Sequence, residues 1–283
     1  MQFVTYERDG VERAGVLAGD EVVDVGASLL ELLRAGGLAA ADRASEREPV
    51  ALAEVRLKAP LPRPNSIRDF MLVEEHVRNS LGSVPDEWYE IPVYWKGNCD
   101  AVLGPDEEVP WPHYTDKLDY ELEVAAVIGR RVRGAGLEEA GQAIAGYTIF
   151  NDWSARDIQF REMKVGLGPG LGKDFATSMG PCLTTADAID IATARMTARV
   201  NGEVWSEGTL GAMRFSFPEV IAHLSKEQTL HPGDVLGSGT VGRGCGLELD
   251  RWIAPGDVVE LEVEGIGALR SRVGQKRKEE IRA

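Results

Sequence analysis

The sequence predicts an α+β protein that is mostly β, with a small N-terminal β-rich domain over residues 1–60 and a larger domain over residues 61–283. Strand-like segments such as LEVAAVIG, AIAGYTIFND and VVELEVEGIGALRSRV outnumber helical stretches such as FPEVIAHLSK. Glycine and proline turns separate these segments, without the regular alternation of strand and helix that βαβ units show. A chain of 283 residues with 43% hydrophobic residues is long enough for one large domain or for a large and a small one.

The first 60 residues contain short elements. MQFVTYERDGVERAGVLAGDEVVDV alternates apolar and polar residues and is broken by Gly and Asp, which predicts small β-hairpins. SLLELLRAGG predicts a short helix that ends at Gly36 and Gly37. KAPLPRPNS has three prolines within five positions, so it can continue neither a helix nor a central strand. We place the domain boundary near residue 60 for this reason.

Charge and cysteine content restrict the partners. The formal net charge of −15 argues against a nucleic-acid or anionic-membrane surface, because clustered Lys and Arg bind phosphates. Cys99, Cys182 and Cys245 are odd in number and lack CxxC spacing, which indicates reduced thiols and a cytoplasmic location. We expect neither an export signal nor a membrane span, since the sequence has no basic start before an apolar stretch and no long apolar run.

Two glutamates share one side of the predicted strand LDYELEVAAVIG. Residues two apart in a strand point to the same face, so Glu121 and Glu123 are neighbours there. If Tyr120, Leu122 and Val124 face a core, the glutamates face something polar, and uncompensated like charges raise each other's pKa. A divalent cation would remove that repulsion. The alternative is a solvent-exposed acidic face.

Further acidic residues fall where they could join this pair. Asp152 in NDWSARDIQ follows an apolar segment and ends a predicted strand. Three carboxylates from two strands favour Mg²⁺, Mn²⁺ or Ca²⁺ over zinc. Asp69 lies seven residues before His76, about two turns away if the segment is helical. His76 taken alone is predicted to be an exposed helix histidine.

A glycine-rich segment, LGPGLGKDFATSMGP, contains Lys173. Glycines allow the backbone to approach a ligand closely, but the spacing matches neither the dinucleotide nor the P-loop pattern. A buried lysine beside a metal would bind a carboxylate or a developing oxyanion. The alternative is a flexible turn.

In their order and separations, RDFMLVEEH, LDYELEVAAVIG, NDWSARDIQ, LGPGLGKDFATS and GSGTVGRG resemble the fumarylacetoacetate hydrolase family. The resemblance covers roughly residues 60–265. It implies a mixed β-roll catalytic domain, a homodimer, a small-molecule oxo-acid substrate, and Mg²⁺, Mn²⁺ or Ca²⁺ as the cofactor.

The resemblance also implies residue roles. It assigns metal binding to Asp69, Glu121, Glu123 and Asp152. His76 matches the general base, and Glu248 matches the glutamate that orients this histidine. Substrate contact or oxyanion stabilisation falls to Arg156, Gln159, Lys173, Thr240 and Trp95, of which Gln159 and Lys173 are also assigned to catalysis. Met71 replaces a substrate-contacting tyrosine, and Asn79 replaces the glutamate of the acylpyruvate-cleaving branch.

These observations favour a metal-dependent hydrolase that cleaves a C–C bond in a 1,3-dicarbonyl or an acylpyruvate- or fumarylacetoacetate-like acid, as in aromatic catabolism. The same constellation could serve a 2-oxo acid decarboxylase or a 2-hydroxy-dienoate isomerase. A non-catalytic metabolite-binding module is the less favoured alternative, because His76, Lys173 and the acidic set are all present.

Overall fold

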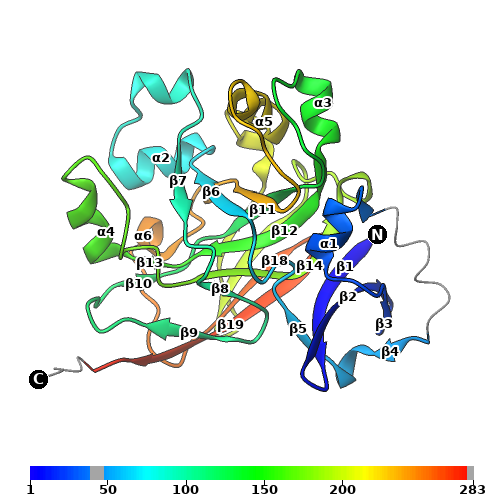
Figure 1. Ribbon diagram of the computed structural model, residues 1–283. Coiled ribbons are helices and arrows are strands. Elements are labelled where there is room, and N and C mark those ends of the chain that lie inside the picture. The colour runs from blue at the N-terminus through cyan, green and yellow to red at the C-terminus, as the bar shows by residue number, and fades with distance from the viewer. Residues whose placement is uncertain (39–47, 279–283) are drawn as a thin grey trace, which may run out of the picture.

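A large mixed β-sheet forms the centre of the protein, which we describe for residues 1–38 and 48–278 of a computed structural model (Figure 1). Over those residues the sheet has 12 strands. Ten of them follow one another in the order β4 (Val50–Ala51), β3 (Glu21–Asp24), β2 (Val11–Ala18), β1 (Gln2–Arg8), β14 (Thr177–Thr185), β12 (Ile144–Asp152), β11 (Glu123–Ile128), β17 (Asp234–Gly237), β6 (Ser66–Phe70) and β7 (Tyr94–Gly97). In addition, β5 (Arg56–Lys58) pairs with β1, and β8 (Val102–Leu103) pairs with β14.

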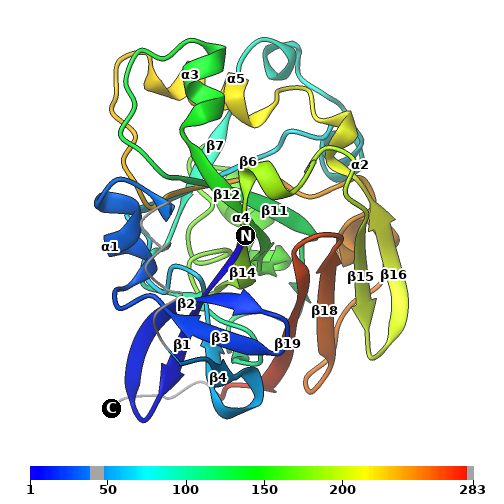
Figure 2. The ribbon, with the colours of Figure 1, turned by 90° about the vertical axis from the view of Figure 1, so that its right-hand side faces the viewer.

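Two smaller sheets complete the β structure. One contains β16 (Glu203–Gly208), β15 (Met196–Val200), β18 (Val258–Val263), β19 (Gly267–Lys276) and β9 (Glu108–Trp111), in that order. Figure 2 shows it beside the large sheet, where β19 packs near β14. The other pairs β10 (Leu118–Asp119) with β13 (Ser154–Ala155). Strands exceed helices throughout, so the predicted α+β, mostly β class is confirmed.

The helices are short. They are α1 (Leu29–Arg34), α2 (Glu74–Leu81), α3 (Leu137–Gln142), α4 (Arg156–Met163), α5 (Phe217–Ser225) and α6 (Gly246–Leu249), with 3₁₀ turns η2 (Leu52–Glu54), η3 (Asp86–Tyr89), η4 (Ala186–Ala188) and η5 (Leu210–Ala212). Both α1 and α5 begin with a capping box, in which a serine and a glutamate three residues later satisfy each other's backbone N–H groups. Within the described ranges no helix is long and apolar enough to cross a membrane.

The N-terminal segment is an antiparallel meander, as the hairpin pattern predicted. β1 pairs with β2 and β2 with β3. β1 also pairs with β14, so the meander continues the large sheet. The proline-rich stretch after β5 forms bends and no regular element. The domain boundary near residue 60 stays a prediction.

Both faces of β11 are covered by apolar side chains. Val124, Ala126 and Ile128 belong to one core cluster, and Ala125 and Val127 belong to the other. This explains the nearly continuous apolar run, because a strand buried on two faces needs no polar alternation. A carboxylate at the start of such a strand is held away from water, and this places the candidate site.

Candidate active site

Four buried carboxylates converge where β6, β11 and β12 lie close together. Asp69 is on β6, Glu123 is the first residue of β11, and Asp152 is the last residue of β12. Glu121 lies two residues before β11, and none of the four is more than 4% exposed. Oxygens of Asp69, Glu121 and Asp152 lie within 4.8 Å of one another. Asp69, Glu121 and Asp152 all act electrostatically on the buried carboxyl of Glu123, so the four groups form one cluster.

The strand before this cluster differs from the prediction. We expected one strand from 118 to 129, but β10 ends at Asp119 and β11 begins at Glu123. The backbone N–H of Glu121 donates to the side chain of Asn151 (2.9 Å), and that of Tyr120 donates to the Asp119 carboxylate (2.9 Å). These two backbone N–H groups therefore bond to side chains and not to the backbone of a neighbouring strand. Tyr120 and Leu122 still face the core, and both glutamates face the cluster.

A glycine makes room for Asp69. Gly237 on β17 is paired with Asp69 on the adjacent parallel strand. A Cβ atom added at Gly237 would lie 2.2 Å from Oδ1 of Asp69. That distance is far inside van der Waals contact, so any side chain at 237 would displace the carboxylate.

The cluster fits a divalent cation. Oδ1 of Asp69, Oε2 of Glu123 and Oδ1 of Asp152 are buried and have no hydrogen-bond partner among the described residues. Buried polar atoms without partners are uncommon in folded proteins because each costs about 1–3 kcal/mol. Carboxylate oxygens are the ligands that Mg²⁺, Mn²⁺ and Ca²⁺ prefer. The acidic cluster can therefore hold such an ion through these oxygens.

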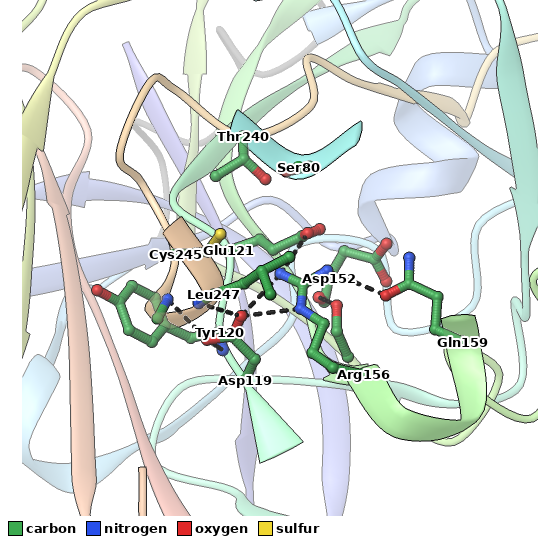
Figure 3. A network of polar contacts seen from close by, with 12 residues as sticks. Ser80, Asp119, Tyr120, Glu121, Asp152, Arg156, Gln159, Thr240, Cys245 and Leu247 are labelled. Atoms are coloured by element: carbon green, nitrogen blue, oxygen red, sulfur yellow. Dashed lines mark hydrogen bonds and ion pairs between the residues drawn. The ribbon is translucent and has the colours of Figure 1, made fainter. Parts of the chain in front are cut away.

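Two buried cations compensate part of the negative charge. Nζ of Lys173 lies 2.7 Å from Oε2 of Glu121 and 2.5 Å from Oδ2 of Asp152. Arg156 pairs with Oε1 of Glu121 and with Oδ2 of Asp119, each at 2.8 Å (Figure 3). Including Asp69 and Glu123, five carboxyl groups face two cations in this cluster.

The two cations compensate the carboxylates unequally, so the pKa values of these carboxylates shift in different directions. Burial raises the pKa of Asp152 well above its ordinary range, and Asp69 and Glu121 add to the rise against the opposing charge of Lys173. Burial and the neighbouring carboxylates likewise raise the pKa of Glu123. Burial also opposes ionisation of Glu121, but Lys173 and Arg156 outweigh it and lower its pKa.

A histidine–glutamate pair lies near this cluster, and His76 lines the same cavity. Nδ1 of His76 on α2 is 2.9 Å from Oε2 of Glu248 on α6. Nδ2 of Asn79 and the backbone N–H of Arg243 donate to the other oxygen of Glu248, at 2.9 and 3.0 Å. The thiol of Cys245 donates to Oε2 at 3.4 Å. These contacts fix the Glu248 carboxylate, which in turn orients the imidazole.

The prediction for the segment around His76 was partly wrong. Residues 69 to 76 are not one helix, because β6 ends at Phe70 and α2 begins at Glu74. Asp69 and His76 are therefore brought together by a strand, a turn and a helix. His76 is also 4% exposed, in contrast to the exposed histidine predicted from its local sequence.

One cavity of about 210 Å³ joins these groups. Of the predicted site residues, Asp69, His76, Trp95, Glu121, Glu123, Arg156, Gln159, Lys173 and Thr240 line it. Asp152 and Glu248 instead contact Lys173 and His76. The indole N–H of Trp95 donates to Asp69 (3.3 Å), and the Thr240 hydroxyl donates to Glu123 (3.1 Å). The amide oxygen of Gln159 accepts from Arg156 at 3.1 Å, as Figure 3 shows.

Asp119 and the apolar part of the cavity were not predicted from the sequence. Asp119 anchors Arg156, and it also accepts from the backbone N–H groups of Gly246 and Leu247. Its position two residues before Glu121 could have revealed it, since the alternation of acidic residues begins there. The apolar part of the cavity, including Tyr94 and Phe160, comes from separate elements and has no shared local signal.

The raised pKa values of Glu123 and Asp152 predict that metal stabilisation increases with pH. A carboxyl group with a raised folded-state pKa keeps its proton where the unfolded chain has lost it, so the metal-free protein loses stability as pH rises above about 4. Protons also compete with the cation for these oxygens. The difference in melting temperature with and without Mn²⁺ should be larger near pH 8 than near pH 5. A constant or shrinking difference would contradict this expectation.

The fold and the site define a class of protein: a mixed-sheet enzyme scaffold with a buried carboxylate centre beside a histidine. Residues 66–274 match the fumarylacetoacetate (FAA) hydrolase C-terminal family, and the chain belongs to this family. The chain is 34% identical over 235 residues to the oxaloacetate tautomerase YisK of Bacillus subtilis, covering 79% of this chain and 75% of that protein.

Solved structures agree with this assignment. A fumarylacetoacetate hydrolase from Exiguobacterium antarcticum superposes with a TM-score of 0.82 at 29% identity, over 98% of this chain and 100% of that one. A maleylpyruvate hydrolase from a Sphingobium species, in complex with manganese and pyruvate, gives a TM-score of 0.78 at 26% identity over the same shares. Family members with these names are enzymes, and one of them holds a divalent ion.

Proposed function

We propose that the protein is a divalent-metal-dependent enzyme that moves a proton next to the carbonyl of a small 2-oxo acid, a keto–enol tautomerisation. One observation carries the proposal. His76, oriented by Glu248, and the carboxylate cluster line the same small cavity. The similarity to an oxaloacetate tautomerase supports it.

The chain's own groups supply the acid–base chemistry. A divalent ion held by Asp69, Glu121, Glu123 and Asp152 would supply a Lewis acid that stabilises negative charge on a carbonyl oxygen. Because Nδ1–H of His76 donates to Glu248, Nε2 is left as the acceptor. His76 takes the proton from the carbon beside the carbonyl and returns it at the oxygen, which is general acid–base catalysis.

The size of the cavity supports a small substrate. At about 210 Å³ it lies below the roughly 300–1,000 Å³ of pockets for drug-sized ligands. Arg156 and Lys173 both line the cavity and can attract the carboxylate of an oxo acid.

The test follows loss of the enol form of oxaloacetate by ultraviolet absorbance. The enzyme is first stripped with EDTA and then reloaded with Mn²⁺ or Mg²⁺. We expect acceleration by the loaded enzyme and none by the stripped one. Equal rates for the two forms, or no acceleration for any 2-oxo acid tried, would refute the proposal.

Hydrolytic C–C cleavage is the second candidate. The same His76–Glu248 pair could take a proton from water, so that hydroxide attacks a carbonyl of an acylpyruvate. The likeness to maleylpyruvate hydrolase and the retained spacing of Asp69 and His76 favour this alternative. Release of pyruvate from acylpyruvates, measured by a coupled lactate dehydrogenase assay, distinguishes it from tautomerisation. The homodimer stays a prediction.

Replacing Lys173 with methionine is expected to impair turnover while sparing metal binding. Lys173 is not a ligand, and its removal leaves Glu121 and Asp152 with less compensated charge, which favours a cation. Turnover should fall about 10²–10³-fold if its ammonium stabilises developing oxyanion charge. Mn²⁺ titration and kcat measure the two effects separately. A loss of Mn²⁺ affinity equal to the loss of rate would contradict this role.

A further inference from the structure

The charged side chains that line the cavity interact with one another and form one group, which we call the charged end. They are Asp69, His76, Glu121, Glu123, Arg156 and Lys173. Both cations, Arg156 and Lys173, are already ion-paired with carboxylates. Among the described lining residues, Arg156 and Lys173 are therefore the Lys and Arg side chains that can attract the head of the substrate, and both belong to the charged end.

Apart from the charged residues, the lining includes the polar side chains of Ser80, Gln159 and Thr240 and an apolar wall, which we define by Met71, Val93, Tyr94, Phe160 and Met163. These residues come from the segment after β6, from β7 and the residue before it, and from α4. Val93, Phe160 and Met163 are 46%, 37% and 39% exposed, so this wall reaches the mouth of the cavity. It contains no Lys, Arg or His among the described lining residues.

Three cations near this wall do not line the cavity: Arg68, and the exposed Arg161 and Lys164, which follow Phe160 and Met163 in the sequence. The guanidinium of Arg68 lies 5.9 Å from the ring centroid of Tyr94. However, Arg68 precedes Asp69 on β6 and so points to the opposite face of the strand. It is buried, its Nη1 lies 3.8 Å from Asp234, and it is not a lining residue.

We propose that the apolar wall selects 2-oxo acids with an uncharged, apolar tail and rejects tails that end in a second carboxylate. This inference rests on the proposed function, since it assumes that the head of a 2-oxo acid occupies the charged end. A terminal carboxylate on the wall would exchange part of its hydration for apolar contacts without gaining a hydrogen-bonded cation, which is unfavourable.

The apolar wall can select only among acids whose tails are longer than that of a four-carbon acid. In oxaloacetate the second carboxylate is separated from the carbonyl carbon by a single CH₂ group, so it remains near the charged end. In a six-carbon acid the terminal group is separated by three CH₂ groups and can reach the wall. Chain length therefore decides which acids the wall can discriminate.

The test compares 2-oxohexanoate with 2-oxohexanedioate, which have the same carbon chain and differ only in a terminal methyl or carboxylate. Binding to the Mn²⁺-loaded full chain is measured by isothermal titration calorimetry. We expect the monocarboxylate to bind at least about tenfold more tightly, because the dicarboxylate must give up part of the hydration of an unpaired charge.

A charge placed on the wall should reverse this order. In M163R, a guanidinium replaces a 39% exposed side chain on α4, and it should tighten 2-oxohexanedioate binding at least about tenfold relative to 2-oxohexanoate. V165R is the matched control. It adds the same charge two residues further on, at an 81% exposed position that does not line the cavity, and should leave the ratio unchanged.

Two results would overturn the inference. If the wild-type protein binds the dicarboxylate as tightly as the monocarboxylate or more tightly, the selective wall is wrong and the proposed function is untouched. If the Mn²⁺-loaded protein binds neither acid and turns over no 2-oxo acid, the proposed function and this inference fail together. The comparison of the two acids needs no variant, so it stands even if M163R folds poorly.

Discussion

Replacing Glu123 with glutamine is expected to abolish metal-dependent activity without destabilising the metal-free protein. Glu123 is fully buried, and its Oε2 has no hydrogen-bond partner in the described structure. Burial and three neighbouring carboxylates raise its pKa, so its ionised form is unfavourable when no cation is bound. Glutamine has nearly the same shape and removes this charge. The melting temperature of the metal-free variant should therefore equal or exceed that of the wild type.

The metal-loaded protein should respond in the opposite way. Loss of an anionic ligand should weaken Mn²⁺ binding by at least about 100-fold, since changes to groups that merely support ligands already cost 10–100-fold. A cation present at 100 times its Kd stabilises a protein by about 2.7 kcal/mol, and this increment should vanish at the same Mn²⁺ concentration. Turnover should vanish with it.

Thermal unfolding with EDTA or with Mn²⁺, together with turnover, measures these effects. E139Q is the control, because Glu139 lies exposed on α3 and its substitution should change neither quantity. Retention of both the Mn²⁺-dependent shift and the activity in E123Q would remove Glu123 from the metal site. A large drop in the melting temperature of the metal-free variant would instead indicate a structural role.

The carboxylate cluster could be predicted because its pattern is local. Glu121 and Glu123 share a face through the two-residue period of a strand, and an apolar run places Asp152 at a strand end. The structure places all three in one cluster. The same alternation includes Asp119, so the information was present in the sequence although we did not use it. The local pattern does not predict the pairing of Asp119 with Arg156, because Arg156 lies 37 residues further along the chain.

The surroundings of His76 could not be predicted in this way, because they depend on distant segments. Its partner Glu248 is 172 residues away and belongs to α6, a helix of four residues that is too short to show a periodic pattern. Its burial results from packing of α2 beside α6, which the local sequence does not encode. Only the resemblance to a family linked the two residues.

The glycine-rich segment around Lys173 illustrates a different limit. Glycines are equally compatible with a flexible turn and with an ordered loop that approaches a ligand. The structure shows an ordered loop, because Lys173 is 3% exposed and its ammonium lies within 2.7 Å of carboxylate oxygens of Glu121 and Asp152. The carboxylates that the lysine meets are 52 and 21 residues away, so the outcome depends on tertiary structure.

Removing the imidazole of His76 is expected to lower kcat by about 10²–10⁴-fold, the range for loss of a positioned general acid–base group. The buried oxygens without hydrogen-bond partners that could bind the ion belong to carboxylates and not to His76. H76A should therefore keep the Mn²⁺-dependent rise in melting temperature. H223A is the matched control, because His223 lies on α5 and does not line this cavity. An H76A rate within a few-fold of wild type would exclude His76 as the base in both proposed reactions.

Glu248 tests whether orientation of His76 matters separately from its presence. Oε2 of Glu248 accepts from His76, while Oε1 accepts from Asn79 and from the backbone N–H of Arg243. Glutamine has one carbonyl oxygen, so E248Q can satisfy one side only and must turn its NH₂ group toward the other. We expect kcat to fall about 10–100-fold, less than in H76A, with Mn²⁺ binding retained. In the double variant H76A/E248Q the two losses should not add, because Glu248 acts through the imidazole. Full additivity would mean that Glu248 acts on the reaction independently of His76.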